Sequence, residues 1–121
     1  MEGLARPPVP YATIARYIAA NVSRRVGVQE LAALARVSVF DLCRAFRRDG
    51  RTTPYRLVLE IRVRHASAML AAGATIAEAA MQTGFADQSH FTRHFKRLTG
   101  MTPRQYVARR AAPRSRTMAS L

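Results

Sequence analysis

The sequence has one cysteine, no tryptophan and only 7 acidic residues among 121. A single cysteine, Cys43, excludes an intramolecular disulfide and a zinc site built from several cysteines, so the fold has to depend on its hydrophobic core. No run of about 18 apolar residues occurs, and we therefore expect no membrane-spanning helix. Residues 1–10 lack the apolar core of a signal peptide, which predicts a cytoplasmic protein.

The residue combinations that enzymes use are also absent. There are no paired carboxylates, no nucleophile with an evident base and no glycine-rich phosphate loop, which predicts that the chain is not an enzyme and uses no cofactor. His90 and His94 stand one helical turn apart, a spacing that can hold zinc. No third ligand accompanies them, so we expect no metal site.

Positive charge is in large excess, because 20 basic residues face 7 acidic ones and the net charge is +13. This excess implies a polyanionic partner, with nucleic acid ahead of a membrane surface. Lys96 is the only lysine, and so many arginines can simply reflect a GC-rich genome. The arginine content alone therefore does not indicate base recognition.

One helical pattern occurs twice. Two apolar stripes with helical spacing lie 48 positions apart (76 − 28), and they consist of Val28, Leu31, Ala32 and Ala35, and of Ile76, Ala79, Ala80 and Thr83. A break and a second helix follow each stripe. The inner faces of these second helices, marked by Phe46 and Phe95, lie 49 positions apart (95 − 46), so one residue is inserted in the second turn. The pattern of each unit predicts a helix-turn-helix.

Capping signals place the helix starts. Thr75 with Glu78 forms a capping box, Ser38 begins a similar pattern, and Thr102 precedes Pro103, so helices should begin near 76, 39 and 103. Between the units, a helix over about 54–71 carries two apolar stripes, which predicts packing on two sides. These stripes are Leu59, Val63, Ala66 and Leu70, and Val58, Ile61 and Met69.

The predicted fold class is all-α, with about seven helices and two helix-turn-helix subdomains joined by a long bridging helix. A first helix is expected from about Tyr11 to Asn21, and no alternating strand pattern occurs. The predicted divisions are a linker or disordered lead-in over 1–10, a first subdomain over 11–52, the bridging helix over 53–72, a second subdomain over 73–110 and a disordered basic tail over 111–121.

A helix-turn-helix exposes one face of its second helix to the major groove of DNA. The residues that we expect on these two faces are Val39, Phe40, Cys43, Arg44 and Arg47 in the first unit, and Gln88, Ser89, Thr92, Arg93 and Lys96 in the second. Phe40, Cys43, Arg44 and Arg47 each have a counterpart 49 positions later. Repetition of a basic face in one register on two helices predicts DNA contact.

The side chains and positions of these residues predict different roles in DNA binding. Arg44 and Arg93 can pair with guanine and Gln88 with adenine, whereas Arg47 and Lys96 are better placed for phosphates.

Two residues of the first face have alternative interpretations. Phe40 either packs against its own subdomain or touches a thymine methyl group. Cys43 is either an oxidant-sensing thiol or, as we favour, a small residue that fits the groove.

The second unit resembles the signature of the AraC/XylS transcription regulators. The motif runs through Ile76–Ala80, Gly84-Phe85, Asp87–Lys96 and Gly100–Pro103 with Tyr106. The upstream half also resembles the family, at Leu31-Ala32, Leu42, Arg44, Phe46 and Pro54, and on the bridging helix at Arg62, Ala66, Met69 and Leu70. The resemblance covers about 11–110. It implies a bilobed domain that inserts two recognition helices into successive major grooves of promoter DNA, often with bending.

The resemblance also implies partners and regulation. We expect a monomeric, nucleoid-associated activator that contacts RNA polymerase, either at the C-terminal domain of its α chain or at sigma. Many family members have a further N-terminal effector or dimerisation domain, so the chain is either a stand-alone regulator or part of a longer one. We expect no small-molecule effector site in it.

The sequence departs from the family pattern at three places. Arg36 stands where the family has a small residue, and this adds about 1 kcal/mol of strain if the position is left-handed. Gly27 replaces a capping Ser or Thr. The first recognition face, with Val39, Phe40 and Cys43, is less polar than the second.

Two other classes of protein remain open. An architectural, nonspecific nucleic-acid binder would need only the positive charge. A protein-interaction module would bind polymerase or another regulator without reading DNA, and it leaves the duplicated basic face unexplained.

Overall fold

The computed structural model describes residues 9–111, and within this range the chain forms seven α-helices and no strand. The helices are α1 (Tyr11–Ala20), α2 (Val28–Ala35), α3 (Val39–Arg48), α4 (Pro54–Ala71), α5 (Ile76–Gln82), α6 (Gln88–Thr99) and α7 (Pro103–Ala111). The predicted all-α class and the predicted helix count are confirmed. Most of the predicted lead-in and nearly all of the predicted basic tail lie outside the described residues.

The helix starts follow the capping residues. The Ser38 hydroxyl accepts a hydrogen bond of 3.0 Å from the Asp41 N–H, so α3 begins at Val39. Thr75 and Glu78 form the predicted reciprocal box, with bonds of 3.0 and 2.8 Å. Each cap satisfies N–H groups of a first turn that have no partner inside the helix. The predicted starts at 39, 76 and 103 are confirmed.

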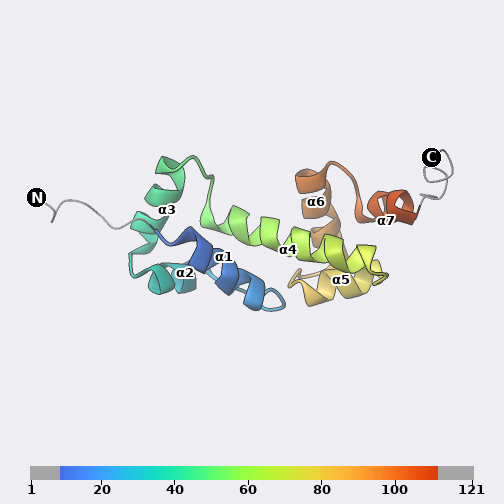
Figure 1. The fold of residues 1–121 in the computed structure, drawn as a ribbon, viewed down its shortest axis with the longest axis horizontal. Coiled ribbons are helices and arrows are strands. Elements are labelled where there is room, and N and C mark those ends of the chain that lie inside the picture. Colours follow the sequence, from blue (N-terminus) through green and yellow to red (C-terminus); the bar gives the residue numbers. More distant parts are fainter. Residues whose placement is uncertain (1–8, 112–121) are drawn as a thin grey trace, which may run out of the picture.

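Helix α4 organises the molecule, since it packs against each of the other six helices described. Figure 1 shows α3 and α6 on the same side of α4, separated along its length, with α1 and α2 toward one end and α5 toward the other. The chain therefore folds as two lobes that share one helix.

Two separate hydrophobic cores lie along α4, as its two apolar stripes predicted. Val58 and Ile61 belong to the core that α4 forms with α1, α2 and α3. The other stripe, consisting of Leu59, Val63, Ala66 and Leu70, belongs entirely to the core formed with α5 and α6. Met69 departs from the prediction, because it packs against this second core and not the first. It lies near the C-terminal end of α4, where the second lobe packs.

The two turns between helices have the same backbone geometry. Arg36 ends α2 with φ 61° and Gly84 follows α5 with φ 83°, both in the left-handed region. The next residue in each turn donates a hydrogen bond back to the helix, from Val37 to the Ala32 carbonyl at 3.0 Å and from Phe85 to the Ala80 carbonyl at 3.1 Å.

The inserted residue of the second turn is Ala86. Ser38 caps α3 directly after Val37, whereas Ala86 separates Phe85 from Asp87, which caps α6 through a 2.7 Å bond from the His90 N–H. The starts of the recognition helices α3 and α6 consequently differ by 49 positions (88 − 39), although the preceding helices α2 and α5 differ by 48 (76 − 28).

Replacement of Arg36 by glycine is expected to stabilise the protein by about 0.5–1 kcal/mol. A left-handed conformation costs a residue with a Cβ about 1–2 kcal/mol, and the entropy of glycine in the unfolded chain offsets part of the gain. Urea denaturation of wild type and Arg36→Gly measures the difference. Arg64→Gly, at an exposed position inside α4, should destabilise instead. A loss of stability in Arg36→Gly would contradict the strain argument.

Candidate nucleic-acid interface

Helices α3 and α6 each bury one face and expose the other. Helix α3 buries Leu42, Ala45 and Phe46, while α6 buries Phe91, His94 and Phe95. Aromatic contacts hold these faces in place, since the Phe46 ring lies 4.9 Å from that of Tyr11 and the Phe95 ring lies 5.5 Å from that of Tyr106. The orientation of each exposed face therefore depends on a rigid aromatic core.

The exposed face of α6 is a continuous polar surface. Gln88, Ser89, Thr92 and Arg93 together line one shallow hollow, with Thr92 half-buried and the others exposed. Within residues 9–111, these four side chains make no hydrogen bond or ion pair with the protein. Their donors and acceptors are free to pair with the edges of bases. Lys96 is exposed one turn further along the helix.

The exposed face of α3 is less polar. Phe40 is 67% exposed and so lies outside the core, and the Arg44 guanidinium lies over its ring at 5.4 Å from the centroid. Arg47 is exposed and Cys43 is half-buried. Val39 packs against the first core, so only part of its side chain is available at the surface.

His90 and His94 form a pair on α6, outside the surface formed by Gln88, Ser89, Thr92 and Arg93. Their Nε2 atoms lie 3.1 Å apart, and both Nδ1 atoms are buried without a hydrogen-bond partner. Burial lowers the pKa of His94, and the nearby His90 lowers it further. No group of three metal-ligating side chains occurs in the part of the chain that the structure describes.

An ionic network holds the loop between α1 and α2. The Glu30 carboxylate accepts hydrogen bonds from Arg24 and Tyr17, and these lower the pKa of Glu30 to about 2.

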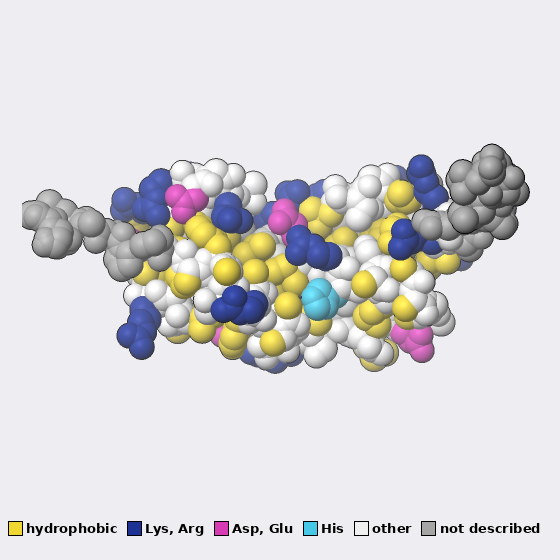
Figure 2. Space-filling view, viewed as in Figure 1, with side chains coloured by type: hydrophobic (Ala, Val, Ile, Leu, Met, Phe, Trp, Pro, Cys, Tyr) yellow, Lys and Arg dark blue, Asp and Glu magenta, His cyan; other side chains and the backbone are white. Residues whose placement is uncertain are grey.

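Away from this loop, positive charge predominates on the surface. Figure 2 shows lysine and arginine side chains along the whole length of one face of the molecule, with few acidic ones between them. A surface of this kind attracts a polyanion.

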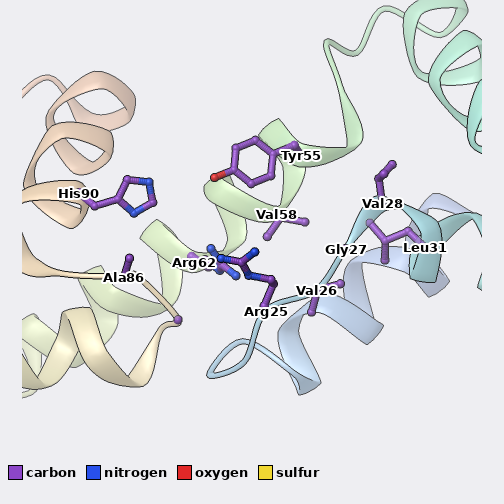
Figure 3. Close-up of a pocket in the computed structure, with 11 residues that line it drawn as sticks. Arg25, Val26, Gly27, Val28, Leu31, Tyr55, Val58, Arg62, Ala86 and His90 are labelled. Atoms are coloured by element: carbon purple, nitrogen blue, oxygen red, sulfur yellow. The ribbon is translucent and has the colours of Figure 1, made fainter.

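A groove between the two lobes was missed by the sequence analysis. It has a volume of about 460 Å³ and combines residues of the α1–α2 loop, α2, α4 and the segment from Gly84 to His90. Figure 3 shows Arg62 and Arg25 near its centre, with Tyr55 and His90 around them. Its members are spread from residue 25 to residue 90, so no local pattern could have identified it.

Two helix-turn-helix units on one shared helix, each with an exposed basic recognition helix, define a double helix-turn-helix DNA-binding domain. None of the helices within residues 9–111 is long and apolar enough to cross a lipid bilayer.

Comparison with known proteins agrees with this class. A family model described as a helix-turn-helix domain matches residues 31–109. The chain is 30% identical over 94 residues to the probable transcriptional regulator LumQ of Photobacterium leiognathi, covering 77% of this chain and 38% of LumQ. It is 32% identical over 90 residues to the uncharacterised regulator YbfI of Bacillus subtilis (strain 168), covering 74% and 33%. The chain thus spans about a third of the length of these curated relatives.

Solved structures are similar over nearly the whole chain. An AraC-type DNA-binding regulator from Chromobacterium violaceum has 28% identity and a TM-score of 0.76, covering 86% of this chain and 95% of its own. The DNA-binding domain of AdpA, solved in complex with a target DNA, has 28% identity and a TM-score of 0.74, covering 92% and 96%. The chain belongs to the AraC-type helix-turn-helix family. The relatives found are transcription regulators with DNA-binding domains and not enzymes, in agreement with the prediction from the sequence.

Proposed function

We propose that the chain binds double-stranded promoter DNA with sequence specificity and activates transcription, by placing α3 and α6 in successive major grooves. One observation carries the proposal: the exposed faces of both helices repeat in one register. Arg44 corresponds to Arg93 and Arg47 to Lys96, and all four are exposed cations. The AdpA domain, similar over most of its length, was solved on DNA.

The residues of the two faces have distinct roles in this proposal. Arg93 and Gln88 read bases in one groove, assisted by Ser89 and Thr92, while Arg44 reads the other. Arg47 and Lys96 bind phosphates and set the register on the duplex. The first recognition helix, α3, reads fewer base pairs than α6, because Phe40 covers part of its surface and Cys43 is half-buried. Phe40 suits contact with a thymine methyl group.

Partners and location follow from the same proposal. One chain carries both recognition helices, so a monomer is sufficient to occupy both grooves. We further propose that it acts in the cytoplasm on the nucleoid, and that activation proceeds through contact with RNA polymerase, either at the C-terminal domain of its α chain or at sigma.

Selection of bound duplexes from a random library tests the proposal. A motif in two parts, with centres about 10–10.5 bp apart, supports recognition of two grooves by one chain. A salt titration on the selected duplex and on a scrambled one separates specific from nonspecific affinity. Equal binding of both duplexes would support the architectural alternative, for which the net charge of +13 alone would suffice. Failure to bind either duplex would support a protein-interaction module.

Arg93→Ala is expected to weaken binding to the selected duplex by about 1–3 kcal/mol and to relax the preference at one base pair. Its guanidinium lies on the exposed face beside Gln88 and Ser89, and truncation would leave the base edge without its partner. Fluorescence anisotropy on specific and scrambled duplexes measures both effects. Arg16→Ala, on the exposed surface of α1, is the control for loss of one positive charge. Equal losses on the two duplexes would contradict base readout by Arg93.

A further inference from the structure

Arg62 is a buried cation at the bottom of the groove between the lobes. It lies on α4 and is only 5% exposed. Its guanidinium donates one hydrogen bond, of 3.4 Å, to the Arg24 carbonyl, and it lies 5.7 Å from the centre of the Phe85 ring. No carboxylate is paired with it among residues 9–111. A buried charge without a counter-ion is unfavourable, so an anion in the groove would be stabilised.

Further unpaired groups surround Arg62. Burial lowers the pKa of Arg62, while the nearby Tyr55 raises it and repulsion from Arg25 lowers it, and both of these neighbours line the same groove. His90 lines the opposite wall, and its Nδ1 atom is buried without a partner. None of the eleven lining residues is acidic.

Neighbouring acids are engaged elsewhere. Glu30 on α2 accepts hydrogen bonds from Arg24 and Tyr17, and Asp87 caps α6. The groove therefore has two guanidinium groups, one imidazole and the half-exposed Tyr55 as donors, and no negative charge of its own.

The position of the groove between the two units favours a DNA phosphate as its anion. Figure 3 shows it between α6, which carries His90, and α2, which carries Val28, so it lies between the two helix-turn-helix units. In the proposed complex, α3 and α6 lie in successive major grooves of one duplex, so the backbone that separates these major grooves passes between the two units. That backbone carries one negative charge per about 1.7 Å of helix axis.

We propose that this groove is a phosphate-binding site for the DNA backbone midway between the two major-groove contacts. The inference rests on the proposed function, because it requires one duplex to engage both helices. Arg25 and Tyr55 meet the phosphate at the rim, while Arg62 provides positive charge below and the His90 imidazole lines the wall beside it. The contact adds affinity without sequence information and holds the two recognition helices at one spacing on the duplex.

Duplexes with neutral methylphosphonates test the proposal. In the selected duplex, the phosphates midway between the two half-sites are replaced one pair at a time, and affinity is measured for wild type, Arg25→Gln and Arg64→Gln. Arg64 is an exposed arginine about 200° around α4 from Arg62, so it faces away from the groove and is a matched control. Arg62 itself is left intact, because its burial makes a folding defect the expected result of mutation.

Wild type and Arg64→Gln should lose on the order of 10-fold in affinity at one central pair. Arg25→Gln should bind the normal duplex more weakly than wild type does. It should lose much less affinity when the central phosphates are neutralised, because the guanidinium that would pair with them has already been removed. Its slope of log affinity against log salt should fall by about 0.9. Methylphosphonates outside the motif should have equal effects on all three proteins.

Other outcomes would overturn the inference in distinguishable ways. Bipartite binding that is unchanged by central methylphosphonates removes the phosphate site but leaves the proposed function intact. If inorganic phosphate then still shifts the NMR signals of His90, the groove binds free anions and not the DNA backbone. A chain that selects no motif would overturn both the proposed function and the inference.

Discussion

Phe95→Ala is expected to lower the free energy of unfolding by about 3–5 kcal/mol, the largest effect of any change considered. The side chain is fully buried, and its ring lies 5.4 Å from that of Phe91 and 5.5 Å from that of Tyr106. Truncation removes apolar contacts from α6 and α7 at once and leaves a cavity in the second core. Urea denaturation followed by far-ultraviolet circular dichroism measures the loss.

Phe40→Ala is the matched control, because Phe40 lies on the first recognition helix and is 67% exposed. We expect its stability to remain within about 0.5 kcal/mol of wild type. A domain of this size is stable by only about 5–15 kcal/mol, so Phe95→Leu, with an expected loss of about 1 kcal/mol, keeps the test measurable if Phe95→Ala unfolds. Equal stabilities of Phe95→Leu and wild type would refute the core assignment.

Gly84→Ala is expected to lower the free energy of unfolding by about 2–4 kcal/mol. Gly84 has φ +83°, and a Cβ there would lie 2.7 Å from the Val22 carbonyl oxygen and 3.1 Å from the Arg62 Nε. The first contact is with backbone, which cannot rotate away. The close approach of Gly84 to Val22 lies where the two lobes meet, because Val22 precedes α2 and Gly84 precedes α6. Thermal and urea denaturation measure the loss.

Gly100→Ala separates the two causes. Gly100 has φ +86°, almost the same as Gly84, but a Cβ there meets nothing within 4 Å. Its cost should therefore be the left-handed conformation alone, about 1 kcal/mol. The difference between the variants reports the close approach of the lobes. If Gly100→Ala were as destabilising as Gly84→Ala, the contact with Val22 would contribute nothing.

Close approach at Gly84 has a consequence for DNA binding. Gly84 and Arg62 both line the groove between the lobes, so the contact that joins the lobes also shapes the proposed phosphate site. A methyl group at residue 84 would displace the Arg62 guanidinium or the Val22 carbonyl. The spacing of α3 and α6 along α4 would change with it, and we expect discrimination between the selected and scrambled duplexes to fall in Gly84→Ala.

Local signals explain why so much of the fold could be predicted. Capping depends on residues three positions apart, so Ser38 and Thr75 placed the starts of α3 and α5 without any knowledge of the tertiary structure. The sequence marked Arg36 as strained only if its position is left-handed, and the structure meets that condition with φ 61°. The exposed register of Arg44 and Arg93 follows from burial of the opposite face, which helical periodicity already indicated.

The packing partners of individual residues depend on long-range contacts, which the sequence does not show. Met69 lay on the predicted stripe of Val58 and Ile61, yet packs in the second lobe, because the partner of each turn of α4 depends on where α5 and α6 dock. The burial of His94 against Phe85 likewise required the α5–α6 turn to be closed.

The sequence by itself determined the helices, their duplication and the charged faces of α3 and α6, since periodicity, capping and charge are properties of neighbouring residues. Only the tertiary structure decided that Arg25, Arg62 and His90 share one groove and that Gly84 meets Val22. These residues are separated by tens of positions along the chain, and α4 brings them together by packing against both lobes at once.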